Sequence, residues 1–114
     1  MARDEKLEHL KRVPLFARMG RHELERLGQL ADEIEVGLDQ ILTEQGRIGH
    51  EFFFVIEGHL VVLDGKRPIA NLGPGDFFGE IALVAHAPRT ATVTTASEVD
   101  LLVITAQSFA TLCA

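Results

Sequence analysis

The sequence of 114 residues predicts a mainly β fold, an antiparallel β-roll (a jelly-roll-like barrel) with helices at both ends, and three observations carry this prediction. Apolar residues recur at helical spacing up to about residue 34. From about Glu33 the chain becomes a series of short segments. Near the end, the apolar run 101–104 precedes Thr105, which can cap a helix. The segments are separated by the turn residues Gly37, Gly46, Gly49, Gly58, Gly65, Gly73 and Gly75. Regular turn signals of this kind are typical of all-β rolls and barrels.

Two short helices are expected ahead of the β-roll. In the first, Leu7, Leu10 and Val13 recur at helical spacing before Pro14. After Gly20 the same spacing returns at Leu24, Leu27, Leu30, Ala31 and Ile34. We therefore expect a single domain over residues 1–114, with a helical part at 1–34, the β-roll at 35–104 and the start of a C-terminal helix at 105–114.

Two tight turns are predicted inside the roll. Asp64-Gly65, between the apolar segments 60–63 and 69–72, is a type I′ hairpin signal. The run Gly73-Pro74-Gly75-Asp76 is typical of a type II turn, because proline presets the second residue and glycine accepts the positive φ of the third. The second turn leads directly into a segment whose residues suit an anion.

Residues 79–90 combine the parts of a phosphate site. Gly79 lets the backbone approach a ligand closely, and residues 79–85 can wind as a short helix whose free N–H groups attract an anion. Arg89 adds a rigid fork of donors at the expected start of a strand over 90–95. Beside a phosphate, the Glu80 carboxylate needs a ligand hydroxyl such as a ribose 2′-OH. The alternatives are an ion pair of Arg89 with Glu80 or Glu98, and a Glu80 that only stabilises the helix start.

The ordered set Phe78-Gly79-Glu80-Ile81-Ala82-Leu83 and Arg89-Thr90-Ala91-Thr92-Val93 resembles the phosphate-binding cassette of cyclic nucleotide-binding domains, of the catabolite activator and protein kinase regulatory subunit type. We call residues 78–93 the cassette. The resemblance implies a regulatory module whose ligand is cyclic AMP or cyclic GMP and which needs no cofactor. It implies these nucleotide contacts: Gly79, Glu80, Ile81, Ala82, Arg89, Thr90, Val62 and Leu72.

Within this set, the resemblance gives the N–H groups of Gly79 and Ala82 and the peptide of Thr90 to the phosphate. Val62 and Leu72 would touch the base or ribose, or would be ordinary core. A hydroxyl residue after the arginine is similar to domains that accept cyclic GMP, yet many such modules accept cyclic AMP. We therefore expect cyclic AMP first and cyclic GMP close behind.

A second set of residues also resembles a signature of the family, one that marks the early strands of the roll. The set consists of Gly46, Gly49, the block Phe52-Phe53-Phe54-Val55 and Gly58. Thr43 stands where an apolar residue is usual, and Arg47 where an acidic or amide residue is usual. These departures predict a differently shaped loop before the phenylalanine block and leave the phosphate site untouched.

The C-terminal helix is expected to be truncated relative to the family, in which it leads into a second helix that closes over the base. A partner, a neighbouring subunit or a longer protein could supply that lid, or the base is left partly open; the sequence leaves these alternatives open. The resemblance makes Leu83, Phe109 and Leu112 switch contacts between the cassette and this helix. The alternative is a static apolar cluster.

Composition narrows the function classes. With 11 basic and 17 acidic residues the net charge is −6, which argues against a nucleic-acid surface. No run approaches the ~20 apolar residues of a membrane span, and the N-terminus lacks a signal-peptide core, so a cytoplasmic location is expected. The single cysteine cannot form an internal disulfide.

No catalytic or metal constellation is evident, because the five histidines include no closely spaced pair with a carboxylate at ligand spacing. We therefore expect no enzyme and no metal. Two alternatives to a cyclic nucleotide sensor remain: a degenerate, ligand-free domain of the same fold used for protein interaction or dimerisation, and a cupin-like metalloenzyme. The sequence leaves open an effector domain, a second subunit or a homodimer as partner.

Overall fold

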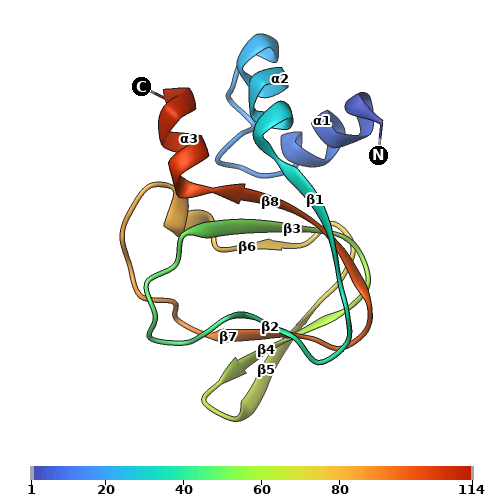
Figure 1. Cartoon of the computed structure of the whole chain (residues 1–114), viewed down its shortest axis with the longest axis vertical. Helices are drawn as coiled ribbons and strands as arrows, with labels where there is room; N and C mark the ends of the chain where they lie inside the picture. The colour runs from blue at the N-terminus through green and yellow to red at the C-terminus, as the bar shows by residue number, and fades with distance from the viewer. Residues whose placement is uncertain (1, 114) are drawn as a thin grey trace.

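The computed structural model describes residues 2–113 and confirms a mainly β domain with flanking helices (Figure 1). In chain order its elements are α1 (Arg3–Lys11), α2 (Arg21–Leu30), β1 (Asp32–Val36), β2 (Ile41–Thr43), β3 (Glu51–Glu57), β4 (Leu60–Asp64), β5 (Arg67–Leu72), β6 (Phe77–Phe78), the 3₁₀ helix η1 (Glu80–Leu83), β7 (Thr92–Thr95), β8 (Val99–Thr105) and α3 (Ala106–Cys113). Among these residues no helix is long and apolar enough to cross a membrane.

Two antiparallel sheets form the roll, with strand orders β1-β8-β3-β6 and β2-β7-β4-β5. In Figure 1 the three helices lie over the outer face of the first sheet, and the second sheet closes the roll on the opposite side. The first sheet is therefore covered on both faces. Its middle strands, β3 and β8, carry continuous apolar runs for this reason.

Alternate residues of the two middle strands serve two different cores. Phe52 pairs with Ile104 and Phe54 with Leu102, and all four side chains pack on the helix side. The intervening residues of the same strands pack inside the roll: Phe53, Val55 and Leu101. The apolar run 101–104 lies in the last strand, β8, whose residues face both cores.

Phe16 joins the helical part to the sheet. Its side chain is fully buried, and its ring lies 5.3 Å from that of Phe52 and 6.0 Å from that of Phe109, measured between centroids. Aromatic pairs at these separations stabilise a core beyond the area they bury. The segment between α1 and α2 is thus a structural contact of both β3 and α3.

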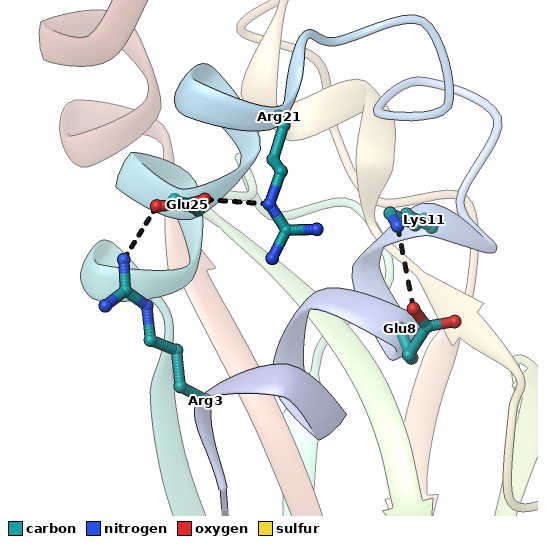
Figure 2. A network of polar contacts seen from close by, with 5 residues as sticks. All are labelled: Arg3, Glu8, Lys11, Arg21 and Glu25. Atoms are coloured by element: carbon teal, nitrogen blue, oxygen red, sulfur yellow. Dashed lines mark hydrogen bonds and ion pairs between the residues drawn. The ribbon is translucent and has the colours of Figure 1, made fainter.

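Ion pairs lie on the surface of the first two helices and contribute little to their packing. Figure 2 shows Glu25 of α2 between Arg3 of α1 at 2.7 Å and Arg21 at 3.0 Å, with Lys11 and Glu8 paired at 3.5 Å. Exposed pairs of this kind contribute about 0–1 kcal/mol each. The helices therefore depend mainly on their buried leucines: Leu7, Leu10, Leu24 and Leu27.

The boundary between the helical part and the roll differs from the predicted one. Helix α2 ends at Leu30, because Ala31 is extended with ψ 126°, and Ile34 belongs to β1, where it pairs with Leu101. Residues 32–36 alternate acidic and apolar side chains, which suits a strand with one covered face. The roll thus begins at Asp32.

One predicted turn is confirmed and the other is displaced. Gly75 has a φ of 91° and Asp76 N donates to the carbonyl oxygen of Gly73 at 3.0 Å, as a type II turn requires. In the hairpin, however, Asp64 pairs with Arg67, so the loop residues are Gly65 and Lys66. Only the first of these has a positive φ, which fits type II′ rather than type I′.

Replacing Phe16 by alanine should lower the free energy of unfolding by about 3–5 kcal/mol, because a fully buried ring is removed between two elements. Urea unfolding would measure the loss. The neighbouring Leu15→Ala, at a side chain that is 37% exposed, is the control and should cost much less. Equal losses would show that Phe16 does not carry the packing.

Candidate functional site

A cavity of about 270 Å³ lies between the cassette and the second sheet. It is lined by Thr43, Val62, Phe78, Gly79, Glu80, Ile81, Ala82, Ala87, Pro88, Arg89, Thr90, Ala91 and Val93. Every predicted nucleotide contact except Leu72 is in this lining. Leu72 is half-buried and packs against the core inside the roll.

Two other hollows, of about 490 and 570 Å³, are larger but suit a phosphate less well. The first is bordered by four carboxylates and no basic residue: Glu35, Glu57, Glu98 and Asp100. Such a rim repels an anion. The second lies between η1 and α3 and contains no arginine or lysine. The smaller cavity contains Arg89 of the cassette and is therefore the better candidate for a phosphate site.

The turn into η1 requires glycine. Gly79 has a φ of 82°, in the left-handed region, and a Cβ built there would lie 2.7 Å from the carbonyl oxygen of Glu51. The predicted helix over 79–85 is shorter than expected, a 3₁₀ helix over Glu80–Leu83. A 3₁₀ helix is used in short pieces because its hydrogen-bond geometry is poorer.

Some backbone N–H groups of this turn are hydrogen-bonded within it and others are not. Ala82 N donates to the carbonyl oxygen of Gly79 at 3.1 Å, so the donor that was expected to face a phosphate is engaged within the turn. The N–H groups of Glu80 and Ile81 precede that hydrogen bond in the helix and have no partner inside it. These two groups are the free donors at the helix start.

Arg89 is held by a neighbouring loop rather than by a strand. Strand β7 begins only at Thr92, which corrects the predicted strand over 90–95. Arg89 N donates to the carbonyl oxygen of Arg47, and Gly46 N donates to the carbonyl oxygen of Arg89, both at 2.8 Å. The two segments are thus paired locally, next to an isolated bridge between Ile48 and Pro88.

The guanidinium of Arg89 is partly buried without a carboxylate partner among residues 2–113. Its Nη2 donates to the carbonyl oxygen of Glu51 at 2.6 Å, and no ion pair with Glu80 or Glu98 forms. Burial lowers the pKa of Arg89, an effect that the charge of Glu51 partly opposes. Arginine still remains protonated near neutrality, so the site holds a cation with most of its five N–H donors unused.

Two polar side chains complete the cavity. Glu80 is half-buried, and its carboxylate has no hydrogen-bond partner in the described part of the chain. Thr90 is exposed at the rim. A carboxylate beside a cationic fork, both lining one cavity, can accept from a hydroxyl while the cation binds a phosphate.

Several lining residues were not predicted. Thr43, buried in β2, donates through its hydroxyl to the carbonyl oxygen of Ala91 at 3.3 Å. Phe78 stacks on Phe53 with a centroid distance of 4.9 Å, and Val93 lies on β7. Phe78 and Val93 belong to the cassette but have the character of core residues, whereas Thr43 is brought to the cavity only by the pairing of β2 with β7.

The predicted switch residues share one cluster. Leu83 of η1 and Phe109 of α3 are buried in the helix-side core, and Leu112 packs against it. Thr105 Oγ1 accepts a hydrogen bond from Ser108 N at 3.1 Å, which confirms the predicted cap of α3. The cassette and α3 are therefore in contact through apolar side chains.

Histidines far apart in sequence come close in space. The rings of His50 and His86 lie 6.3 Å apart between centroids, beside the hollow between η1 and α3. Within residues 2–113, however, no group of three or more histidine, cysteine, aspartate or glutamate side chains could hold a metal ion.

The β-roll with an arginine-bearing cassette defines a class of ligand-binding domain, and comparison with known proteins identifies it. Residues 33–114 match the family model of the cyclic nucleotide-binding domain. The chain therefore belongs to the cyclic nucleotide-binding domain family, which is defined by ligand binding rather than by catalysis.

Relatives with curated names are longer proteins. The chain is 37% identical over 97 residues to a cyclic nucleotide-gated potassium channel of Rhizobium etli, covering 85% of this chain and 27% of the channel. It is 36% identical over 92 residues to a cAMP-dependent protein kinase regulatory subunit of Mycosarcoma maydis, covering 77% of this chain and 18% of the subunit. The chain thus spans only a fraction of the length of these relatives.

Solved structures share the fold. The regulatory domain of Toxoplasma gondii PKA with cAMP superimposes with a TM-score of 0.87 at 30% identity, covering 96% of this chain and 44% of that chain. A cyclic nucleotide-binding-like protein from Brucella abortus gives a TM-score of 0.90 at 22% identity, covering 96% of this chain and 98% of that chain.

Replacing Gly79 by alanine should destabilise the fold more than replacing Gly65. Both glycines have a positive φ, which costs alanine about 1–2 kcal/mol, but only at Gly79 does a Cβ meet neighbouring atoms. The clash should add about 1–3 kcal/mol to the loss at Gly79. Urea unfolding of the two variants would measure the difference, and equal losses would contradict the tight turn described here.

Proposed function

We propose that this chain is a regulatory module that binds cyclic AMP in the cavity between the cassette and the second sheet. The observation that carries the proposal is Arg89, a partly buried cation whose guanidinium donates to one backbone carbonyl and lines an apolar-walled cavity. A partly buried cation without an ion-pair partner among residues 2–113, whose charge Glu51 offsets only in part, favours an anion that enters the site. A cyclic phosphodiester carries one such charge.

The arrangement of the lining supports a nucleotide rather than a simple anion. Arg89 and the free N–H groups of Glu80 and Ile81 would hold the phosphate, and the Glu80 carboxylate would accept from the ribose 2′-OH. Val62 and Val93, from the second sheet, offer apolar contacts for the sugar and base. The proposed contacts keep the predicted residues except Leu72, which packs in the core, and add Val93. The N–H groups of Glu80 and Ile81 replace that of Ala82 as phosphate donors.

Cyclic AMP is placed ahead of cyclic GMP on the strength of the relatives. The matched kinase regulatory subunits are named as cAMP-dependent, and the Toxoplasma gondii structure contains cAMP. Cyclic GMP remains the second candidate ligand, because the residue after Arg89 is Thr90, which lies at the rim of the cavity.

The proposed output passes through the contact of η1 with α3. When a phosphate orders the turn at Gly79, Leu83 would shift and α3 would follow, because Phe109 and Leu112 pack against the same cluster. The proposal treats residues 1–114 as one domain without catalytic activity. An effector domain or second subunit, and a cytoplasmic location, stay predictions.

Calorimetric titration should show binding of cyclic AMP to the native chain and a large loss in Arg89→Ala. Leaving the phosphate without its charged partner costs about 2–5 kcal/mol, or roughly 30-fold to several thousand-fold in affinity. The control is Arg47→Ala, because this exposed arginine pairs with Glu44 and touches the site only through its backbone. Ligand at ~100 times its dissociation constant should also stabilise the fold by about 2.7 kcal/mol.

No heat with cyclic AMP or cyclic GMP would sink the proposal and favour the ligand-free alternative. Equal affinity of the native chain and Arg89→Ala would place the ligand elsewhere.

Glu80→Gln should weaken binding of cyclic AMP by less than Arg89→Ala, by about 1–2 kcal/mol, because a charge-assisted hydrogen bond becomes a neutral one. The same titration with 2′-deoxy cyclic AMP separates the roles, since the substitution should leave the affinity for this analogue unchanged. Glu98→Gln, at the acidic hollow, is the control. A loss for the deoxy ligand as large as for cyclic AMP would remove the 2′-OH contact from Glu80.

A further inference from the structure

Gly49 lies against the side chain of Arg89. A Cβ built on Gly49 would collide with the Nε and Cζ atoms of Arg89 and lie 2.7 Å from its Cδ. These three atoms are the nearest ones around the built Cβ. Gly49 is buried and lines a second hollow together with Arg89.

The backbone itself does not require glycine at this position. Gly49 is not among the residues with a positive φ, so an L side chain would not strain its dihedral angles. The need for glycine therefore comes from the space that the Arg89 side chain occupies. This differs from Gly79, where a left-handed φ and a close backbone oxygen act together.

The position of Gly49 is also tied to the cassette. Gly49 N donates to the carbonyl oxygen of Ala87 at 3.4 Å, and the nearby Arg47 and Gly46 pair with the backbone of Arg89. A shift of this loop that relieved the clash of a side chain at residue 49 would break those hydrogen bonds. The Arg89 side chain, which has four rotatable bonds, would move instead.

The Arg89 side chain also passes close to a second glycine, because its Nη1 lies 2.5 Å from a Cβ built on Gly79. We call the space beside these two glycines the slot; within it, Nη2 donates to the carbonyl oxygen of Glu51. An arginine held in this way loses less conformational freedom when it binds a ligand. The slot keeps the fork of donors aimed at the cavity before any ligand arrives.

We propose that Gly49 is a positioning residue for the phosphate contact of Arg89. It acts by leaving free the volume that the Arg89 side chain occupies beside Gly49, with Nη2 on the Glu51 carbonyl. The role in binding rests on the proposed function. The packing contact itself can be tested without any nucleotide.

The test is a double-mutant cycle of Gly49→Ala and Arg89→Ala, with Gly37→Ala as the matched control. Gly37 also lacks a positive φ, and a Cβ built there meets nothing within 4 Å. Without nucleotide, Gly49→Ala should lower the melting temperature by about 5 °C or more, because the displaced Arg89 side chain loses its hydrogen bond to the Glu51 carbonyl, while Gly37→Ala should not. In the Arg89→Ala background, Gly49→Ala should cause no further drop, because the colliding side chain is gone.

Titration with cyclic AMP, well below the melting temperature, gives the second readout. Gly49→Ala should bind about 10- to 100-fold more weakly, as expected when a hydrogen bond to a charged group is misaligned. The double variant should bind no more weakly than Arg89→Ala alone. Native affinity in Gly49→Ala would overturn the positioning role.

The outcomes separate this inference from the proposed function. An equal drop in melting temperature in both backgrounds, or a double variant that fails to fold when Arg89→Ala folds, would show that residue 49 collides with something other than Arg89. If Gly49→Ala alone fails to fold, a folded double variant supports the slot. If the native chain binds no nucleotide, the proposed function fails, and the melting cycle still decides whether the contact exists.

Discussion

The site depends on one interaction, the hydrogen bond from Nη2 of Arg89 to the carbonyl oxygen of Glu51. A carbonyl dipole orients the guanidinium but does not neutralise it, whereas a carboxylate at that place would. The cost of partly burying this charge is visible in the lowered pKa of Arg89. Much of the surrounding geometry follows from that choice: a left-handed turn at Gly79, a side-chain-free position at Gly49 and a loop that pairs with the arginine backbone. In the proposed function, an incoming anion would supply the negative charge that Glu51 provides only in part.

The start of β3 is where the cavity meets the helical part. The carbonyl of Glu51 accepts from Arg89, and the carbonyl of the preceding residue, His50, accepts from Ala106 N, the first residue of α3, at 2.7 Å. Consecutive peptide groups therefore contact Arg89 of the proposed phosphate site and the first residue of the C-terminal helix. This backbone contact stands beside the apolar contact of Leu83 with the helix-side core.

Local patterns predicted what is contiguous in sequence and missed what distant segments bring together. The cassette supplies most of the cavity lining from one stretch, so its residues could be recognised directly. Thr43 lines the cavity from β2, and the Glu51 carbonyl accepts from Arg89 at the start of β3, so both contacts come from strands far from the cassette in sequence. The loop around Arg47 was expected to leave the phosphate site untouched; its side chain does point to Glu44, but its carbonyl holds Arg89. The errors at Ile34 and Asp64 have local causes. An apolar residue at helical spacing also fits an alternating strand, and a glycine with a positive φ suits the first loop position of a type II′ turn as well as the second position of a type I′ turn.

The net charge of the chain is negative, whereas Arg89 in the cavity is positive. The distance over which each charge acts decides which anions can bind. A net charge of −6 repels anions at long range, but at physiological salt this field decays over about 8 Å. Contacts of the kind that Arg89 makes act near 3 Å and in a partly buried site, where screening is weak. A polyanion must remain on the acidic surface and feels the repulsion of many carboxylates, such as those around the hollow at Glu98. A single phosphodiester that enters the cavity leaves that field behind and meets the cation at close range. The same charge distribution therefore disfavours nucleic acid and favours a small cyclic nucleotide.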